Sequence, residues 1–148
     1  MKVSDCMTRE VTTLAPDRTI RDAARLMSDR DIGAIPVGEN DRLVGMITDR
    51  DIAVRAIGRG KGPDTPIRDV MSDQVLYCFE DEELNHVARN MGDQQVRRLP
   101  VMDRHKRLVG IVALGDIACG ATSKRLVGEA LSGISREGGQ HDQAQTAH

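Results

Sequence analysis

Residues 42–53 read RLVGMITDRDIA, and a second copy of this stretch, RLVGIVALGDIA, occupies residues 107–118. Upstream of the stretch the spacing between matching residues is 64 rather than 65, as for Met7 and Met71. The extra residue falls in a polar, turn-like segment that follows position 37 in the first copy, where insertions are well tolerated. The chain is therefore built from two copies of one unit.

Each copy has the same order of hydrophobic patterns. A short β-branched run (11–13 and 75–77) precedes a helix with apolar residues at i, i+3, i+4 and i+7. These helix residues are Ile20, Ala23, Ala24 and Met27 in the first copy, and Leu84, Val87, Ala88 and Met91 in the second. Two strands joined by a polar turn follow, at 34–37 and 43–48 and then at 99–102 and 108–113. A second helix begins near Asp49 and near Gly115, so the predicted unit is β-α-β-β-α.

The composition argues against several classes of function. The 148 residues carry 21 Lys and Arg against 23 Asp and Glu, a net charge of −2, whereas a protein that neutralises nucleic-acid backbones needs a basic face. Aromatic residues make up 1%, too few for base-stacking platforms. No apolar run approaches the ~20 residues of a membrane span, no signal peptide is visible, and the three cysteines are scattered. We expect a soluble, cytoplasmic protein with an aliphatic core.

The domain boundaries follow from the repeat and from composition. We expect a first repeat at 1–58, a Gly-rich linker at 59–66 and a second repeat at 67–120. An amphipathic C-terminal helix is predicted within 121–135, and the aperiodic tail at 136–148 is expected to be disordered. The fold class is α/β, with the two repeats forming one pseudo-two-fold module.

The tandem unit resembles the CBS domain, and two copies resemble the CBS pair, or Bateman module, of small stand-alone bacterial proteins. The resemblance covers residues 3 to about 119 and rests on Ile32–Val37, on 43–52 and on their counterparts in the second copy. It implies a regulatory module that binds adenine nucleotides in clefts between its repeats, with AMP, ADP, ATP, NAD and related adenosyl compounds as candidate ligands. It also implies a homodimer, an unidentified downstream protein partner, no required cofactor and no catalysis.

The sharpest candidate site is Thr48-Asp49-Arg50-Asp51, where a strand ends and a helix begins. Thr48 and Asp51 share one face of the first helical turn, so the carboxylate could accept hydrogen bonds from a ribose diol and the hydroxyl could add another. Arg50 could contact a phosphate. The same Thr-x-x-Asp pattern is also a capping box, which only stabilises a helix. The two interpretations are compatible, and the resemblance favours ribose binding.

The second copy keeps the carboxylate as Asp116 but has Ala113 and Gly115 in place of the threonine and the arginine. We take the retention of Asp116 without its hydroxyl partner to favour ligand binding. Loss of the hydroxyl weakens that contact by about 0.5–1.5 kcal/mol. Two unequal sites are therefore expected, with the Thr48/Asp51 site the better formed.

Further candidate ligand contacts lie at the start of the strand that precedes each junction. Arg97 and Arg98 have the geometry of phosphate clamps, although a solvated pair at a strand start is the simpler interpretation. Gly33 permits close approach of a ligand to the backbone. The resemblance also places the backbone around Ile35, Pro36 and Pro100 in an adenine pocket.

No nucleophile paired with a base, no phosphate-binding glycine loop and no metal-ligand spacing is visible in the sequence. A small enzyme is therefore the weakest hypothesis. The main alternative to a ligand sensor is a structural or interaction dimer module that binds no nucleotide, and Ala113 and Gly115 are the residues that favour it.

Overall fold

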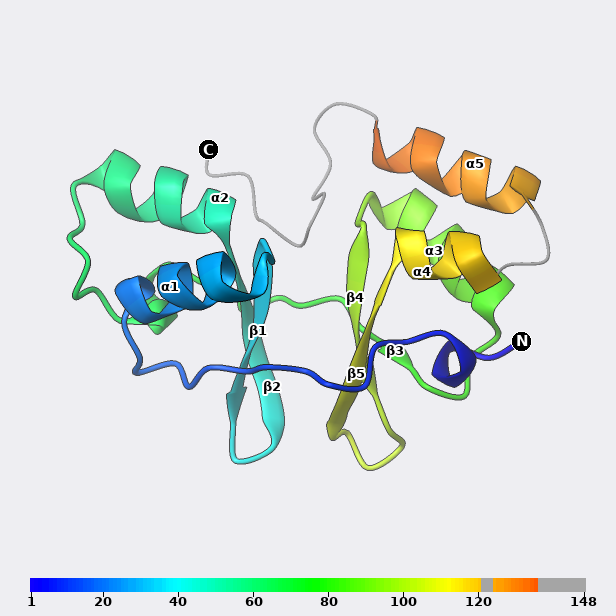
Figure 1. Ribbon diagram of the computed structural model, residues 1–148, viewed down its shortest axis with the longest axis horizontal. Coiled ribbons are helices and arrows are strands. Elements are labelled where there is room, and N and C mark those ends of the chain that lie inside the picture. Colours follow the sequence, from blue (N-terminus) through cyan, green and yellow to red (C-terminus); the bar gives the residue numbers. More distant parts are fainter. Residues whose placement is uncertain (121–123, 136–148) are drawn as a thin grey trace. The chain divides into compact units, whose positions relative to one another are not determined.

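The computed structural model describes residues 1–120 and 124–135, and the tail predicted at 136–148 lies outside them. Its contacts divide the chain into two units, which are described separately (Figure 1). The β1–β2 unit is Thr12–Val75, and we name it after the hairpin of β1 (Ala34–Glu39) and β2 (Arg42–Thr48). The β4–β5 unit combines Met1–Val11 with the described residues from Leu76 onward.

The β1–β2 unit has one long helix and a shorter helical segment of mixed type. α1 (Ile20–Arg30) starts with a reciprocal cap, in which Thr19 Oγ1 accepts the Asp22 N–H and the Asp22 carboxylate accepts the Thr19 N–H. After β2 the chain passes into α2 (Asp49–Asp51), which continues as a π-helix (Ile52–Ala56) and a 3-10 turn (Ile57–Arg59). The predicted linker packs within this unit, since Thr65 O and Pro63 O accept N–H groups at the start of α1.

The β4–β5 unit contains three strands, three α-helices and a 3-10 helix (Val3–Asp5) among the described residues. The elements in chain order are β3 (Cys78–Phe79), α3 (Leu84–Gln94), β4 (Arg98–Met102), β5 (Leu108–Ala113), α4 (Leu114–Gly120) and α5 (Lys124–Ile134). β4 pairs antiparallel with β5 and parallel with β3. The α/β fold, both hairpins and the long helix of each repeat are confirmed.

Both hairpins depart from regular pairing at one position. The register shifts between Val37 and Gly38 in β1, and between Val101 and Met102 in β4, positions that match along the repeat. The turns differ in length, and each uses residues with positive φ, Asn40 and Asp41 in the first and Lys106 in the second. The one-residue insertion inferred from the repeat is thus absorbed beyond the paired strands.

The strand predicted at the start of each repeat is wrong in position. Residues 11–13 form no strand, and in that repeat Leu14 alone makes a parallel bridge to Val37. The second copy pairs at Cys78–Phe79 rather than at 75–77. Burial decides the register, because Cys78 is buried and pairs with Val101, whereas Tyr77 is 46% exposed. Pro16 follows Leu14 closely and lacks the N–H that further pairing would need.

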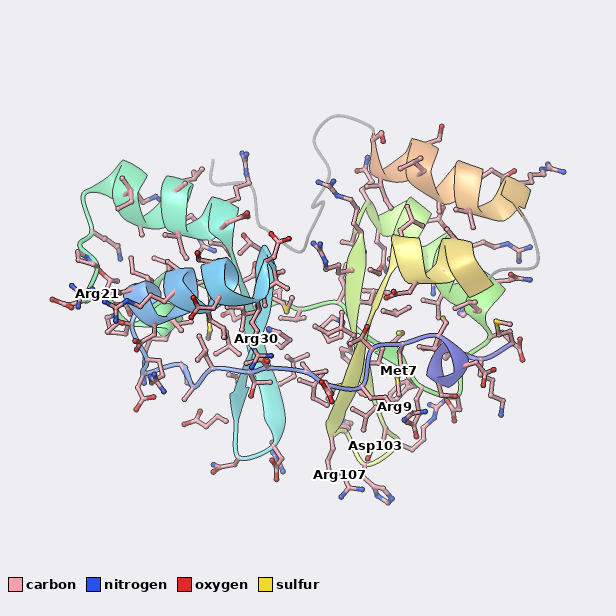
Figure 2. All side chains as sticks on the ribbon, in the orientation of Figure 1. Met7, Arg9, Arg21, Arg30, Asp103 and Arg107 are labelled. Carbon is pink, nitrogen blue, oxygen red and sulfur yellow. The ribbon has the colours of Figure 1, made fainter. Side chains whose placement is uncertain are left out.

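The first residues of each repeat pair with the hairpin of the other repeat. Thr8 exchanges two hydrogen bonds with Ile111 of β5 (2.8 and 2.9 Å), and Ser72 does the same with Met46 of β2 (both 2.9 Å). Figure 2 shows Met7 where this N-terminal segment runs along β5. The repeat as read along the sequence is therefore not the unit of packing.

The glycine next to each of these bridges makes the close approach possible. A Cβ on Gly45 would lie 2.7 Å from Ser72 O, and one on Gly110 would lie 2.8 Å from Thr8 O. Real Cβ atoms do not come this close to backbone oxygen, so the position admits only glycine without a shift of the backbone. This explains why the repeat keeps a glycine in the middle of a strand.

Each unit has its own aliphatic core. The helix stripe of the second copy is buried as predicted, but in the first copy Ala24 is exposed, which corrects that prediction. The difference follows from α5, which packs against α3 and brings the Ala130 backbone onto Gly92. No helix within 1–120 or 124–135 combines the length and apolar character needed to cross a membrane.

Candidate functional site

The first junction, where β2 passes into α2, is closed by a reciprocal cap. Asp51 N–H donates to Thr48 Oγ1 (3.0 Å), and Thr48 N–H donates to Asp51 Oδ2 (2.9 Å). Both side chains are 1% exposed. The capping interpretation of Thr48-x-x-Asp51 is thus realised, and it still leaves the second carboxylate oxygen for another partner.

That second oxygen, Asp51 Oδ1, is buried and accepts no hydrogen bond. Arg55 Nη1 lies 3.7 Å from it, too far for a hydrogen bond, and the same Nη1 donates to the Met71 carbonyl at 3.2 Å. Burial raises the pKa of the Asp51 carboxyl, although the Thr48 hydrogen bonds and the Arg55 charge act in the opposite direction. The Arg55 charge therefore partly offsets the burial of this oxygen, which still lacks the hydrogen bond that most buried acceptors have.

The second junction, where β5 passes into α4, keeps half of this cap. Ala113 N–H donates to Asp116 Oδ2 at 2.9 Å, in the same way that Thr48 N–H donates to Asp51. Asp116 therefore has a capping role without a hydroxyl partner, which overturns the argument that its retention points to a ligand. Unlike Asp51, Asp116 is half-buried rather than fully enclosed.

A pocket of about 270 Å³ opens at the second junction and is lined by Arg97, Arg98, Ala113, Leu114 and Gly115. The strand start and the helix start are joined here by a backbone hydrogen bond from Leu114 N–H to Arg97 O (2.9 Å). Arg97 is exposed and Arg98 is half-buried. The arginine pair of the sequence prediction is thus brought together with the residues beside Asp116.

At the first junction the matching backbone bond runs from Asp49 N–H to Gly33 O (3.0 Å), and the Asp49 carboxylate lies over Gly33. Arg50 is exposed and directly adjacent. The other predicted contacts, Ile35, Pro36 and Pro100, are buried. Ile35 and Pro36 belong to β1 and Pro100 to β4, so a ligand that used them would meet backbone rather than side chains.

The sequence prediction missed Arg55 and assigned no role to Asp49 or Leu114. Arg55 follows Asp51 by four residues, the spacing of an ion pair on a helix, and that signal was available. Asp49 and Leu114 occupy matching positions of the repeat, so aligning the copies could have shown their difference in charge. No group of three or more His, Cys, Asp or Glu able to hold a metal ion occurs among the residues described.

Comparisons with known proteins give one consistent result. The sequence pattern of the CBS domain matches the chain twice, at residues 3–57 and 67–119. CBS domain-containing protein YhcV of Bacillus subtilis (strain 168) is 44% identical over 135 residues, which cover 91% of this chain and 96% of YhcV.

Two solved structures are similar in both fold and sequence. Hypoxic Response Protein I with two coordinated zinc ions has a TM-score of 0.73 and 37% identity, covering 81% of this chain and 98% of that one. The CBS domain pair of protein MJ0100, in complex with 5′-methylthioadenosine and S-adenosyl-L-methionine, has a TM-score of 0.71 and 31% identity. That match covers 80% of this chain and 94% of the MJ0100 chain.

Proposed function

Because the chain belongs to the CBS domain family, we propose that it is a regulatory module that binds an adenosine-containing ligand at its strand–helix junctions. AMP, ADP, ATP, NAD and adenosyl compounds are the candidate ligands. The module performs no catalysis of its own, acts in the cytoplasm and passes ligand occupancy to a protein partner.

The observation that carries the proposal is the buried carboxylate oxygen of Asp51 that accepts no hydrogen bond at the first junction. Asp51 and Asp116 each use one oxygen to cap a helix through the N–H three residues earlier. At the first junction the other oxygen is a buried acceptor without a donor. A ribose presents two adjacent hydroxyl donors, and a hydrogen bond to a charged acceptor is among the stronger ones.

Similarity supports the same class of ligand. The CBS pair of protein MJ0100 was solved with 5′-methylthioadenosine and S-adenosyl-L-methionine, both of which contain adenosine. That chain is 31% identical to this one, and the match covers 80% of this chain. Adenosine compounds are therefore the first ligands to test.

We test the proposal by calorimetric titration of the wild-type protein with AMP, ATP, NAD, 5′-methylthioadenosine and S-adenosyl-L-methionine. Asp51→Asn and Asp116→Asn are titrated alongside, because the amide oxygen still caps the helix while the NH₂ group cannot accept a ribose hydroxyl. We expect wild type to bind at least one ligand and the variants to lose affinity about tenfold or more.

Asp22→Asn is the matched control. Asp22 closes the same type of capping box on α1 and belongs to neither junction. A loss of affinity in this variant equal to that of Asp51→Asn would attribute the effect to helix capping. Failure of wild type to bind any of the five compounds would refute a nucleotide sensor.

A homodimer is part of the proposal. The helical segment after α2 exposes Val54 and Ile57, with Ile57 63% exposed, and both are apolar residues on one short segment. Burying such residues against a second copy is favourable. Sedimentation of the titrated samples tests this, and a monomer at every concentration would contradict it.

The second candidate function is an interaction module that binds no nucleotide. The burial of Asp51 favours this second function. A ligand could reach Asp51 Oδ1 only if the residues that bury it moved aside. A stable dimer that binds none of the five compounds would support this alternative.

A further inference from the structure

Arg55 forms an ion pair with the buried carboxylate of the first junction. Its Nη1 lies 3.7 Å from Asp51 Oδ1, and this is the one ion pair that Asp51 makes within the described part of the chain. The side chain of Arg55 is 19% exposed and that of Asp51 is 1% exposed. Removal of Arg55 would therefore leave a buried carboxylate without a compensating charge.

Arg55 supplies this charge without occupying the free oxygen of Asp51. The 3.7 Å separation exceeds hydrogen-bond distance, and Nη1 donates instead to the Met71 carbonyl at 3.2 Å. A guanidinium bonded directly to Oδ1 would compete with a ligand hydroxyl for the same lone pairs. Oδ1 thus remains able to accept a hydrogen bond while a nearby cation stabilises its charge.

Within the described part of the chain, the other groups around Asp51 are uncharged or exposed. Its charged neighbours on α2, Asp49 and Arg50, are both exposed. The end of β2 contributes the hydroxyl and N–H of Thr48, and the segment beside Arg55 contributes the Met71 carbonyl. The charge state of Asp51 therefore depends chiefly on its burial and on Arg55.

Burial and Arg55 act on Asp51 in opposite directions. Burial raises the pKa of the Asp51 carboxyl, and the Arg55 charge lowers it. Without Arg55 the carboxyl would take up a proton at a higher pH than it does in the wild type. A protonated carboxyl is a weaker acceptor than a carboxylate, because charge strengthens the hydrogen bond.

The backbone after Asp51 and the comparison of the two copies both distinguish Arg55. The segment that carries it, Ile52–Ala56, is a π-helix, a rare form that occurs frequently at functional sites. The matching position in the second copy is Gly120, at the end of α4, which has no side chain to supply a charge. The second junction thus keeps its carboxylate, Asp116, without a cation at this position.

We propose that Arg55 is a positioning residue for ligand binding at the first junction: it keeps Asp51 ionised and leaves Asp51 Oδ1 free to accept a ribose hydroxyl. The proposal rests on the proposed function and adds the residue on which this carboxylate depends. Arg55 acts through Asp51 rather than by contact with the ligand. Its removal should therefore weaken binding most at low pH, where the carboxyl is closest to protonation.

The test measures the affinity for 5′-methylthioadenosine by calorimetry in an Asp116→Asn background, which leaves the first junction intact. This compound has no phosphate to titrate near neutral pH. Arg55→Gln removes the charge and keeps an N–H donor for the Met71 carbonyl. We expect affinity to fall about tenfold or more at about pH 6, and to recover to within about threefold at about pH 8.

If only phosphorylated compounds bind, AMP is the probe, since its own titration cancels in the ratio of variant to unchanged protein. A residue with a structural role alone would lower the affinity by the same factor at both pH values.

Two further variants serve as controls. Arg55→Lys keeps a positive charge and should keep the pH dependence of the wild type. Arg59→Gln makes the same change at an exposed arginine of the same helical segment, and we expect it to leave affinity unchanged at both pH values.

The carbon-13 chemical shift of the Asp51 carboxyl gives a second readout that needs no ligand. The midpoint of its titration should lie higher in Arg55→Gln than in the wild type, and should be unchanged in Arg59→Gln. If Arg55→Gln does not fold, Asp51→Asn/Arg55→Gln should fold, because a carboxamide needs no compensating cation. A double variant that also fails to fold would assign Arg55 a structural role and overturn the proposal.

The outcomes separate this proposal from the proposed function. Failure of the wild type to bind any of the five compounds would refute the proposed function itself. Three results would overturn the role of Arg55 and leave the sensor proposal standing. These are no binding in the Asp116→Asn background, an unchanged Asp51 midpoint in Arg55→Gln, or an equal loss of affinity at both pH values.

Discussion

The β1–β2 unit and the β4–β5 unit share a hairpin with the same register shift, but they differ on the outer face of the long helix. α3 is covered by α5, and Ala88 is buried, whereas the matching Ala24 on α1 is exposed. The reason lies one turn further along each helix, where α3 has Gly92 and α1 has Ser28. A Cβ at Gly92 would lie 2.8 Å from the Ala130 Cα, so a serine there would be incompatible with the docked helix.

The two copies share the residues that the close packing of each unit requires, and they differ at positions on the surface. Glycine recurs at 45 and 110, where the backbone of Ser72 or Thr8 comes within contact distance. The residues at the junctions and on the outer helix face differ between copies. On the outer helix face, side-chain identity follows from what each copy contacts, as Gly92 against α5 shows.

The largest expected effect comes from replacing the glycine that both units share next to a close backbone contact. Gly45→Ala and Gly110→Ala should each destabilise the fold by about 2–3 kcal/mol, since the new methyl group collides with backbone oxygen that cannot move cheaply. The free energy of unfolding is measured by urea titration. Gly62→Ala is the control, because a Cβ at Gly62 has no neighbour within 4 Å.

Two similar losses would show that both units depend on the same close approach. A cost below about 0.5 kcal/mol, the usual range for surface substitutions, would mean that the segment next to the glycine can move aside.

The next largest effect comes from weakening the contact between α5 and α3. Gly133→Ala should destabilise the protein by about 1–2 kcal/mol, because its Cβ would collide with the backbone of Gly92 and displace α5 from α3. Hydrogen exchange should speed up in α3 and remain unchanged in α1.

Gly128→Ala provides the control in the same helix. No atom lies near a Cβ at Gly128, so alanine should stabilise α5 by up to about 1 kcal/mol through helix propensity alone. Equal exchange rates in α3 for wild type and Gly133→Ala would contradict the docking account.

How much of the structure the sequence predicts depends on how far apart the interacting residues lie along the chain. Patterns within ten or twenty residues, such as the buried stripe of α3 or the β1–β2 hairpin, were predicted correctly because local periodicity encodes them. The pairing of Thr8 with Ile111 was missed, since no local pattern indicates which distant edge a short segment will join. The exposure of Ala24 was missed for the same reason, because burial of its counterpart depends on a helix some forty residues away.

In the candidate site, too, the local features were predictable and those that depend on tertiary packing were not. The positions of Thr48 and Asp51 in one capping box were predictable from their spacing. The enclosure of Asp51 was not, because it depends on Arg55 and on the segment around Met71, which tertiary packing brings to the junction. The pocket beside Arg97 and Arg98 likewise depends on how closely the start of β4 meets α4.

The smallest expected effect sharpens the comparison at the junctions themselves. Thr48→Ala should destabilise the protein by about 1 kcal/mol, because it removes the acceptor of the buried Asp51 N–H. Ala113→Thr should stabilise it by about 0.5 kcal/mol, since the new hydroxyl can accept the Asp116 N–H and complete the half cap. Urea titration at neutral pH measures both free energies.

Thr19→Ala, which opens the more exposed box on α1, is the control for capping alone. If Thr48→Ala costs more than Thr19→Ala, the excess reflects the buried setting of the first junction, where water cannot replace the lost acceptor. If Ala113→Thr stabilises the fold without changing ligand affinity, the hydroxyl serves the helix and the carboxylate alone serves the ligand. If affinity also rises, the threonine contributes to binding, and the two junctions differ by that hydroxyl as well as by Arg55.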